Sequence, residues 1–146
     1  MRRLTLALLL VVIAQPVQAV CVVVPLAYLL AEEDFAVVFT GTVREVHTTS
    51  VGQVATFAVD RVWKGQLSNR ETIYNLQDIE PEDFKEGRRY LVFGYKQSAA
   101  ERERFGLVSG NPATLGTNGC SVHPADGANA ERILGDAPGY PPFQKP

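Results

Sequence analysis

Apolar and polar residues alternate most clearly in the first half of the chain. Over residues 37–44 apolar positions alternate with threonine and arginine, which is the two-residue period of a strand with one face toward a core. Gly41 is expected to mark a bend in this strand. The alternation returns over 54–63, and the turn-like segment 48–53 between them contains Gly52, which can adopt the left-handed conformation. The two segments are therefore predicted to form a β-hairpin.

Three more segments are predicted as strands, at 71–76, 90–95 and 105–108. Residues 90–95 are apolar at nearly every position, which fits a strand covered on both faces. The connection 77–87 is acidic and contains proline, and we expect Phe84 to pin it to the core.

Helices are predicted near both ends of the chain. Pro25 suits the first turn of a helix that carries a stripe of leucines, made of Leu26, Leu29 and Leu30. Asp126 is expected to cap a second short helix, with Gly135 as its stop. Residues 97–104 are predicted to be a charged hairpin loop, and 111–119 are rich in turn residues. About five or six strands without a βαβ rhythm predict a mainly β fold, a small antiparallel barrel or sandwich.

The first 19 residues have the pattern of a secretory leader. Arg2 and Arg3 form a basic start, residues 4–14 an apolar run, and Val17-Gln18-Ala19 a cleavage site of small residues. The apolar run is too short to cross a bilayer, so no membrane span is predicted. We expect a mature protein that begins at Val20 and is secreted or periplasmic.

The rest of the chain suits one domain. We assign residues 20–136 to it and 137–146 to a proline-rich tail that is extended or mobile. Without the leader, 12 basic residues face 16 acidic ones, and no strand face combines basic and aromatic residues. This charge balance argues against a nucleic-acid partner.

Cys21 and Cys120 are the only cysteines of the chain. In an exported protein two cysteines are expected to form a disulfide. A closed loop of about 100 residues would stabilise the fold by roughly 4 to 5 kcal/mol in the chain-entropy model. His123 follows Cys120 at a metal-like spacing, but two ligands do not make a site and the thiol is already used.

No motif predicts an enzyme. The sequence contains no Gly-x-Ser-x-Gly elbow, phosphate loop or dinucleotide fingerprint, and His47 and His123 have no catalytic partner pattern. We predict no catalytic, cofactor-binding or metal-binding residues of its own, and hence no cofactor. Trp63, at a strand end, is predicted to be a core or barrel-rim residue rather than a binding aromatic.

A patch of acidic residues follows the third predicted strand. It consists of Asp78, Glu80, Glu82 and Asp83. The patch lacks the Asp-x-Asp-x-Asp-Gly spacing of a calcium loop, so we interpret it as a solvated loop.

Three segments together resemble a known family. They are Ala-Val-Val-Phe-Thr-Gly-Thr-Val at 36–43, Phe-Ala-Val-Asp-Arg-Val-Trp-Lys-Gly at 57–65, and Phe-Lys-Glu-Gly-Arg-Arg-Tyr-Leu-Val-Phe at 84–93. With the early Cys21 and the late Asn-Gly-Cys at 118–120, their order resembles the bacterial TIMP-like (tissue inhibitor of metalloproteinases), netrin-like secreted domains. The resemblance implies a five-stranded barrel of the oligonucleotide/oligosaccharide-binding (OB) type with short flanking helices.

The resemblance also suggests how such a domain can act. In the animal inhibitors of this family, the α-amine and carbonyl of the first cysteine chelate the zinc of a protease, a role that only Cys21 matches here. Cleavage after Ala19 leaves Val20 in front of Cys21 and turns that amine into an amide. We therefore expect a monomeric, non-enzymatic domain that binds a protein partner. A metalloprotease inhibitor acting through Cys21 is the alternative, and a small-ligand binder in the barrel mouth remains a third hypothesis.

Overall fold

The computed structural model describes residues 21–50, 52–76, 83–104 and 115–144. The predicted leader, its cleavage site before Val20 and the predicted strand at 105–108 lie outside the described residues. So do three members of the acidic patch, Asp78, Glu80 and Glu82.

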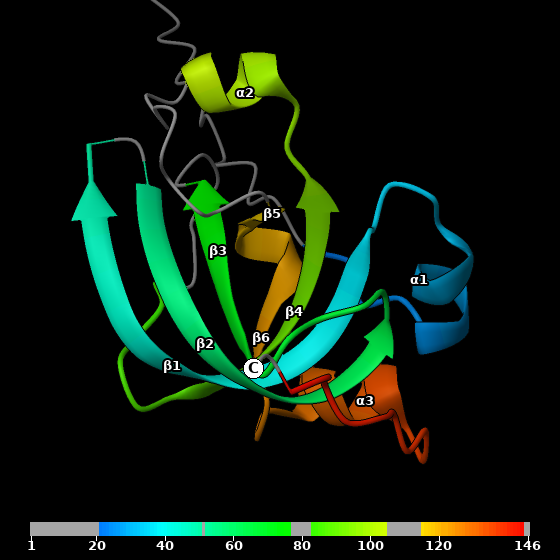
Figure 1. Cartoon of the computed structure of the whole chain (residues 1–146). Coiled ribbons are helices and arrows are strands. Elements are labelled where there is room, and N and C mark those ends of the chain that lie inside the picture. Colours follow the sequence, from blue (N-terminus) through cyan, green and yellow to red (C-terminus); the bar gives the residue numbers. More distant parts are fainter. Residues whose placement is uncertain (1–20, 51, 77–82, 105–114, 145–146) are drawn as a thin grey trace, which may run out of the picture.

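Five strands close into a barrel (Figure 1). They are β1 (Val37–Thr49), β2 (Gly52–Lys64), β3 (Arg70–Leu76), β4 (Arg89–Lys96) and β5 (Leu115–Asn118). Their order is β1-β2-β3-β5-β4, and pairing of β4 with β1 closes the ring. A short strand β6 (Val122–Pro124) pairs with the first half of β4. The chain is therefore mainly β, with an OB-fold-like barrel, which confirms the predicted fold class.

Two details of the sheet differ from the sequence-based expectation. The pair β3–β5 is parallel, whereas all the other strand pairs are antiparallel. The strand β5 also lies in the segment 111–119, for which only turns were predicted. Leu-Gly-Thr-Asn has little strand propensity of its own, and this strand forms because β3 and β4 supply hydrogen-bonding partners on its two sides.

The predicted bend at Gly41 is confirmed. The register between β1 and β2 shifts between Thr40 and Gly41. A Cβ atom on Gly41 would lie 2.9 Å from the backbone oxygen of Ala58. The absence of a side chain therefore lets the two strands approach closely where β1 bends.

Short helical segments flank the barrel in the described part of the chain: α1 (Leu26–Ala31), α2 (Ala99–Arg104), the 3-10 helix η1 (Gly119–Ser121) and α3 (Ala128–Leu134). The loop predicted at 97–104 is wrong over residues 99–104, which form α2. The sequence of this helix, Ala-Ala-Glu-Arg-Glu-Arg, consists of good helix formers. The stop of α3 at Gly135 is confirmed, but the N-cap is Gly127. The carboxylate of Asp126 instead lies 3.9 Å from the guanidinium of Arg88.

Aromatic rings make a series of edge-to-face contacts inside the barrel. Phe57 meets Phe39 and Phe84 edge to face, with ring centroids 5.5 and 5.1 Å apart, and Phe84 meets Tyr90 at 5.4 Å. Phe84 is almost fully buried, so it pins the loop before β4 as predicted. Such pairs add stability beyond the apolar area that they bury.

A second apolar cluster lies outside the barrel wall. Leu91 and Phe93 of β4 pack there with Leu29 of α1 and Ile133 of α3, while Tyr90 and Val92 point into the barrel cluster. The strand β4 is therefore covered on both faces, as its apolar sequence predicted.

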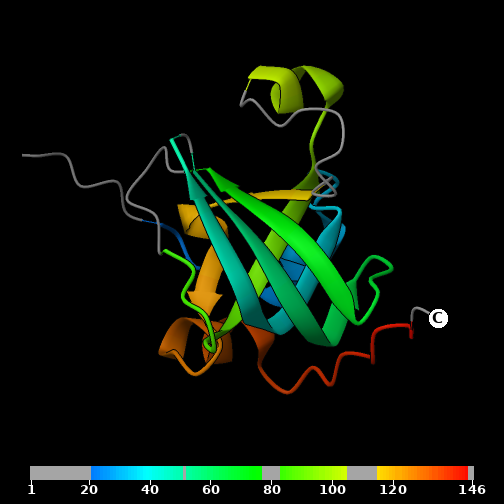
Figure 2. The ribbon, with the colours of Figure 1, turned by 60° about the vertical axis from the view of Figure 1, so that its left-hand side comes forward.

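The C-terminal segment 137–144 is extended and bound to the barrel (Figure 2). The backbones of Tyr140 and Val62 exchange two hydrogen bonds of 2.8 Å. Phe143 donates its N–H to Leu67 O and accepts one from Asn69, both at 3.0 Å. Of the two sequence-based alternatives for this tail, extended or mobile, the structure has the extended one over these residues.

Candidate interaction surface at the N-terminal edge

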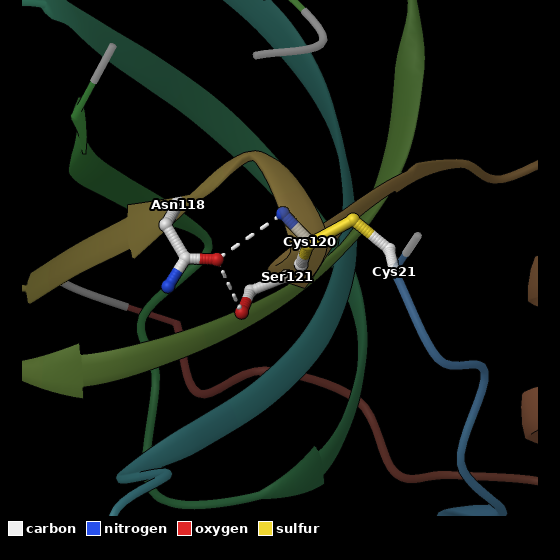
Figure 3. Close-up of a disulfide and its surroundings, with 4 residues drawn as sticks. All are labelled: Cys21, Asn118, Cys120 and Ser121. Carbon is white, nitrogen blue, oxygen red and sulfur yellow. Dashed lines mark hydrogen bonds between the residues drawn. A yellow bond between two sulfur atoms is a disulfide. The ribbon is translucent and has the colours of Figure 1, made fainter. Parts of the chain in front are cut away.

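The disulfide between Cys21 and Cys120 joins the start of the described chain to η1, just after the end of β5 (Figure 3). The two Cα atoms are 5.2 Å apart although 99 residues separate them in sequence. The predicted bridge is therefore present, and neither thiol is available for metal binding or for nucleophilic chemistry.

Asn118 fixes the position of Cys120. Its side-chain Oδ1 accepts hydrogen bonds from the backbone N–H of Cys120, at 3.1 Å, and from the hydroxyl of Ser121, at 3.0 Å. Asparagine favours such local side-chain-to-backbone bonds at the start of helical turns. The end of β5 therefore turns sharply into η1 and presents Cys120 to the N-terminal segment (Figure 3).

Helix α1 holds the residues after Cys21 against the barrel. Leu26 and Leu29 are buried in the outer apolar cluster. The ammonium group of Lys64, at the end of β2, donates to the carbonyl oxygens of Leu29 and Glu32. These two oxygens belong to the last turn of the helix, where unpaired carbonyls attract a cation.

The N-terminal edge, which we define as residues 21–31, exposes apolar side chains to solvent. The large apolar residues of the described chain that are exposed are Val22, Tyr28, Leu30, Tyr140 and Phe143. Three of these five lie in the N-terminal edge. Val22 is 77% exposed and Tyr28 56%. These side chains therefore place apolar surface in contact with solvent instead of packing it in the core.

The exposure of Leu30 corrects the predicted leucine stripe. Leu26 and Leu29 are buried as expected, but Leu30 is 40% exposed. The helix has only six residues, and only the face with the i, i+3 pair reaches the barrel. Tyr28 was not identified from the sequence, because a lone tyrosine beside a leucine pattern is equally compatible with a core position.

Carboxylates surround Tyr28. A hydrogen bond and the negative charge of Glu32 raise the pKa of the Tyr28 phenol, with smaller contributions from desolvation and from the charge of Asp34. The phenol is therefore neutral at physiological pH and combines an apolar ring with a hydrogen-bonding tip, a combination enriched at protein interfaces.

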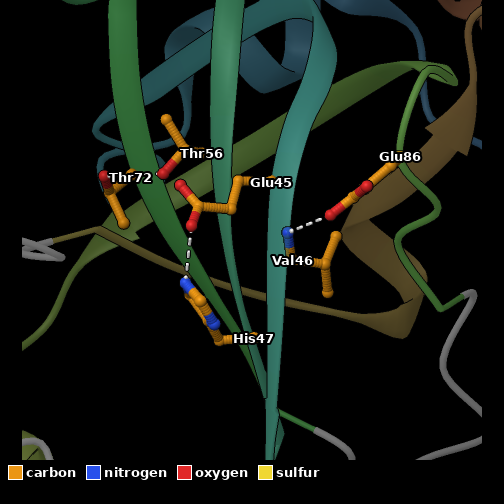
Figure 4. A network of polar contacts seen from close by, with 6 residues as sticks. All are labelled: Glu45, Val46, His47, Thr56, Thr72 and Glu86. Carbon is orange, nitrogen blue, oxygen red and sulfur yellow. Dashed lines mark hydrogen bonds and ion pairs between the residues drawn. The ribbon is translucent and has the colours of Figure 1, made fainter.

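The two histidines lie in different environments. His47, near the end of β1, is exposed, and its Nε2 is 2.9 Å from Glu45 Oε1 (Figure 4). His123 in β6 is buried, and its ring centroid lies 5.7 Å from that of Phe93. Within the described residues, no three His, Cys, Asp or Glu side chains gather as a metal site.

Trp63, one residue before the end of β2, packs against the outer apolar cluster. It is half-buried, and its Nε1–H donates to Ala137 O at 3.0 Å. The indole therefore anchors the C-terminal segment. Asp83, the one described member of the acidic patch, is exposed, in agreement with a solvated loop.

No protein-family model and no curated protein matches this chain. Among the helices of the described residues, none is long and apolar enough to span a membrane.

Proposed function

We propose that this protein is an exported, non-enzymatic domain of the TIMP-like class that binds a protein partner through its N-terminal edge. The observation that carries the proposal is the gathering of exposed apolar side chains on a short segment held in place at both ends. Cys21 is tied to Cys120, and α1 is tied to the barrel by its buried leucines and by Lys64. A preordered surface loses little conformational entropy on binding, which favours affinity.

The chemistry of the edge suggests the kind of partner. Apolar and aromatic side chains next to acidic residues correspond to the usual core and rim of a protein interface. The acidic residues Glu32, Glu33 and Asp34 directly follow α1. A partner with an apolar patch bordered by Lys or Arg would complement both features.

Site-specific photo-crosslinking tests this proposal. The experiment is done in the cells that naturally make and export the protein. A photoreactive phenylalanine analogue replaces Tyr28. Tyr140, which is 44% exposed on the C-terminal segment, is the matched control position. We expect a specific adduct from position 28 that is lost when Leu30 is changed to Asp, and none from position 140. Equal adducts from both positions, or none from position 28, would contradict the proposal.

Export itself is supported by the disulfide, because such bridges persist in oxidising compartments such as the periplasm and the extracellular space. N-terminal sequencing of the exported protein locates the cleavage site, which we expect before Val20. Retention of residues 1–19 on a cytoplasmic protein would contradict export.

A metalloprotease inhibitor is the second candidate function. It is favoured by Cys21, an exposed residue whose side chain is locked in the disulfide. The mechanism requires a free α-amine on Cys21, because an amide nitrogen is a poor zinc ligand. A mature chain that begins at Cys21 and inhibits a zinc protease would support this function, and a chain that begins at Val20 would remove it.

A further inference from the structure

A cavity of about 480 Å³ opens at one end of the barrel, where β1 and β3 begin and β2 and β4 end. Its walls are partly apolar, formed by Val37, Leu67 and Leu115. The strand β5 begins at this cavity and ends two residues before Cys120. The cavity therefore lies at the other end of β5 from the disulfide, and it is separate from the N-terminal edge.

The carboxamide of Gln97 is buried in the wall of this cavity. Gln97 is only 8% exposed. Neither its Nε2 nor its Oε1 makes a hydrogen bond among the described residues. A buried amide normally has partners for both atoms, because losing water without replacing it costs free energy. Such an exception in a cavity wall points to a ligand that completes the hydrogen bonds.

The fold makes room for this side chain. Gly116 of β5 faces Gln97, and a Cβ atom there would lie 2.9 Å from Gln97 Nε2. It would also lie 2.9 Å from the ring of Tyr95. Any larger residue at position 116 would push the carboxamide out of its place, so the position of Gln97 depends on a glycine on the neighbouring strand.

The charges that line the cavity favour an anion. Arg102 of α2 is half-buried, and its Nε lies within the protein without a hydrogen-bond partner among the described residues. Lys96 adds a second cation. The lining also contains one carboxylate, that of Glu71, whose Oε1 accepts from the N–H and the hydroxyl of Ser68, both at 2.8 Å. The two cations outnumber this one anion.

We propose that this cavity binds a small organic carboxylate with an amide group next to it and an apolar end. The carboxylate pairs with the guanidinium of Arg102, in the geometry that arginine offers to planar anions. The amide of the ligand pairs with the carboxamide of Gln97, which can both donate and accept. The apolar end lies against Val37, Leu67 and Leu115. The volume is within the range of small-molecule sites.

The proposal is tested with N-benzoylglycine, which has these three parts, and with N-benzoylglycinamide as its neutral counterpart. Each is titrated into the isotope-labelled, disulfide-bonded mature protein, and the side-chain amide signals of Gln97 are followed by NMR. A probe of this size is expected to bind with a Kd on the order of 1 mM. We expect the acid to shift the Gln97 signals and the amide to bind at least about tenfold more weakly. No shift at about 20 mM acid, or equal binding of both probes, would overturn the proposal.

Two variants separate binding from folding. Gln97→Leu removes the unpaired carboxamide at similar volume, so binding should be lost while the Tm stays equal or rises, as at many sites that sacrifice stability for function. A lower Tm would mean that the carboxamide is satisfied in the free protein, and would overturn the proposal. Arg102→Met should weaken binding of the acid about tenfold, whereas Arg132→Met, on the exposed surface of α3, should leave it unchanged.

Discussion

The indole Nε1–H of Trp63 donates a hydrogen bond to the carbonyl oxygen of Ala137 across 3.0 Å, which joins the end of β2 to the C-terminal segment. Gly139 lies directly on the same indole, where a Cβ atom would be 2.9 Å from Cε2. The strand β3 pairs with β2 only as far as Ala58. The C-terminal segment therefore covers the part of the β2 edge that β3 leaves open, with Tyr140 paired to Val62.

Ending the chain after Asp136 should destabilise the protein and expose this edge. The truncation removes the backbone bonds to Val62, Leu67 and Asn69 and uncovers Trp63. At about 1 kcal/mol for each net hydrogen bond, less the ordering entropy of the segment, the loss is roughly 1 to 3 kcal/mol. Urea denaturation measures it, and light scattering should detect self-association through the open edge. A chain ending after Gln144 is the control, and equal stability of the two chains would contradict the role of the segment.

Replacing both cysteines by serine should lower the free energy of unfolding by up to about 5 kcal/mol. The bridge spans 99 residues, and the reason is the larger conformational entropy of the unfolded chain without it. Neither cysteine belongs to the buried apolar cluster inside the barrel, so far-UV circular dichroism should still report a folded β protein at low temperature. A change below about 1 kcal/mol would mean that the chain-entropy model fails for this domain.

Gly52→Ala should be strongly destabilising. Gly52 begins β2, and a Cβ atom there would lie 2.2 Å from the backbone oxygen of Asn75 on β3. Since a backbone atom cannot move away cheaply, we expect a loss of about 3 kcal/mol in chemical denaturation. Gly87→Ala is the comparison, because nothing lies within 4 Å of its Cβ position although its φ is +78°. It should cost roughly 1 kcal/mol, and equal effects of both variants would contradict the role of strand spacing.

Stability should fall at high pH because of Tyr74. Its phenol is fully buried, and desolvation raises its pKa above the ordinary value of 10.0, while a hydrogen bond with Thr49 opposes part of the shift. A raised pKa of a neutral acid contributes stability below pH 10, and this contribution is lost as the pH rises toward the folded-state pKa. One such proton gives a slope of up to about 1.4 kcal/mol per pH unit.

Denaturation curves of the parent and of Tyr74→Phe at several pH values from 9 to 11 test this expectation. The variant cannot ionise at this position, so its stability should decline less steeply with pH. Parallel declines of the two proteins would assign the alkaline loss to other groups.

The sequence by itself determined the long elements of the barrel wall. The alternation in β1 and β2 and the continuous apolar run of β4 predict strands because side chains on a strand point to opposite faces with a period of two. The same sequence also predicted the partner of each cysteine, since the chain contains only two. Their joining in space follows from the closure of the barrel, which brings the turn after β5 next to the first described residue, Cys21.

Only the tertiary structure decided the features whose cause is distant in sequence. Leu115–Asn118 is a strand because β3 and β4 lie on either side of it, and no local propensity encodes that. The proline-rich segment is fixed because β2 has an open edge. The sequence around Gln97 is that of a polar loop, and the room for its side chain depends on Gly116 of β5, where a Cβ atom would lie 2.9 Å from Gln97 Nε2. Local patterns report which face of an element is apolar, but the partner of that element, and hence the position of each site, depends on long-range packing.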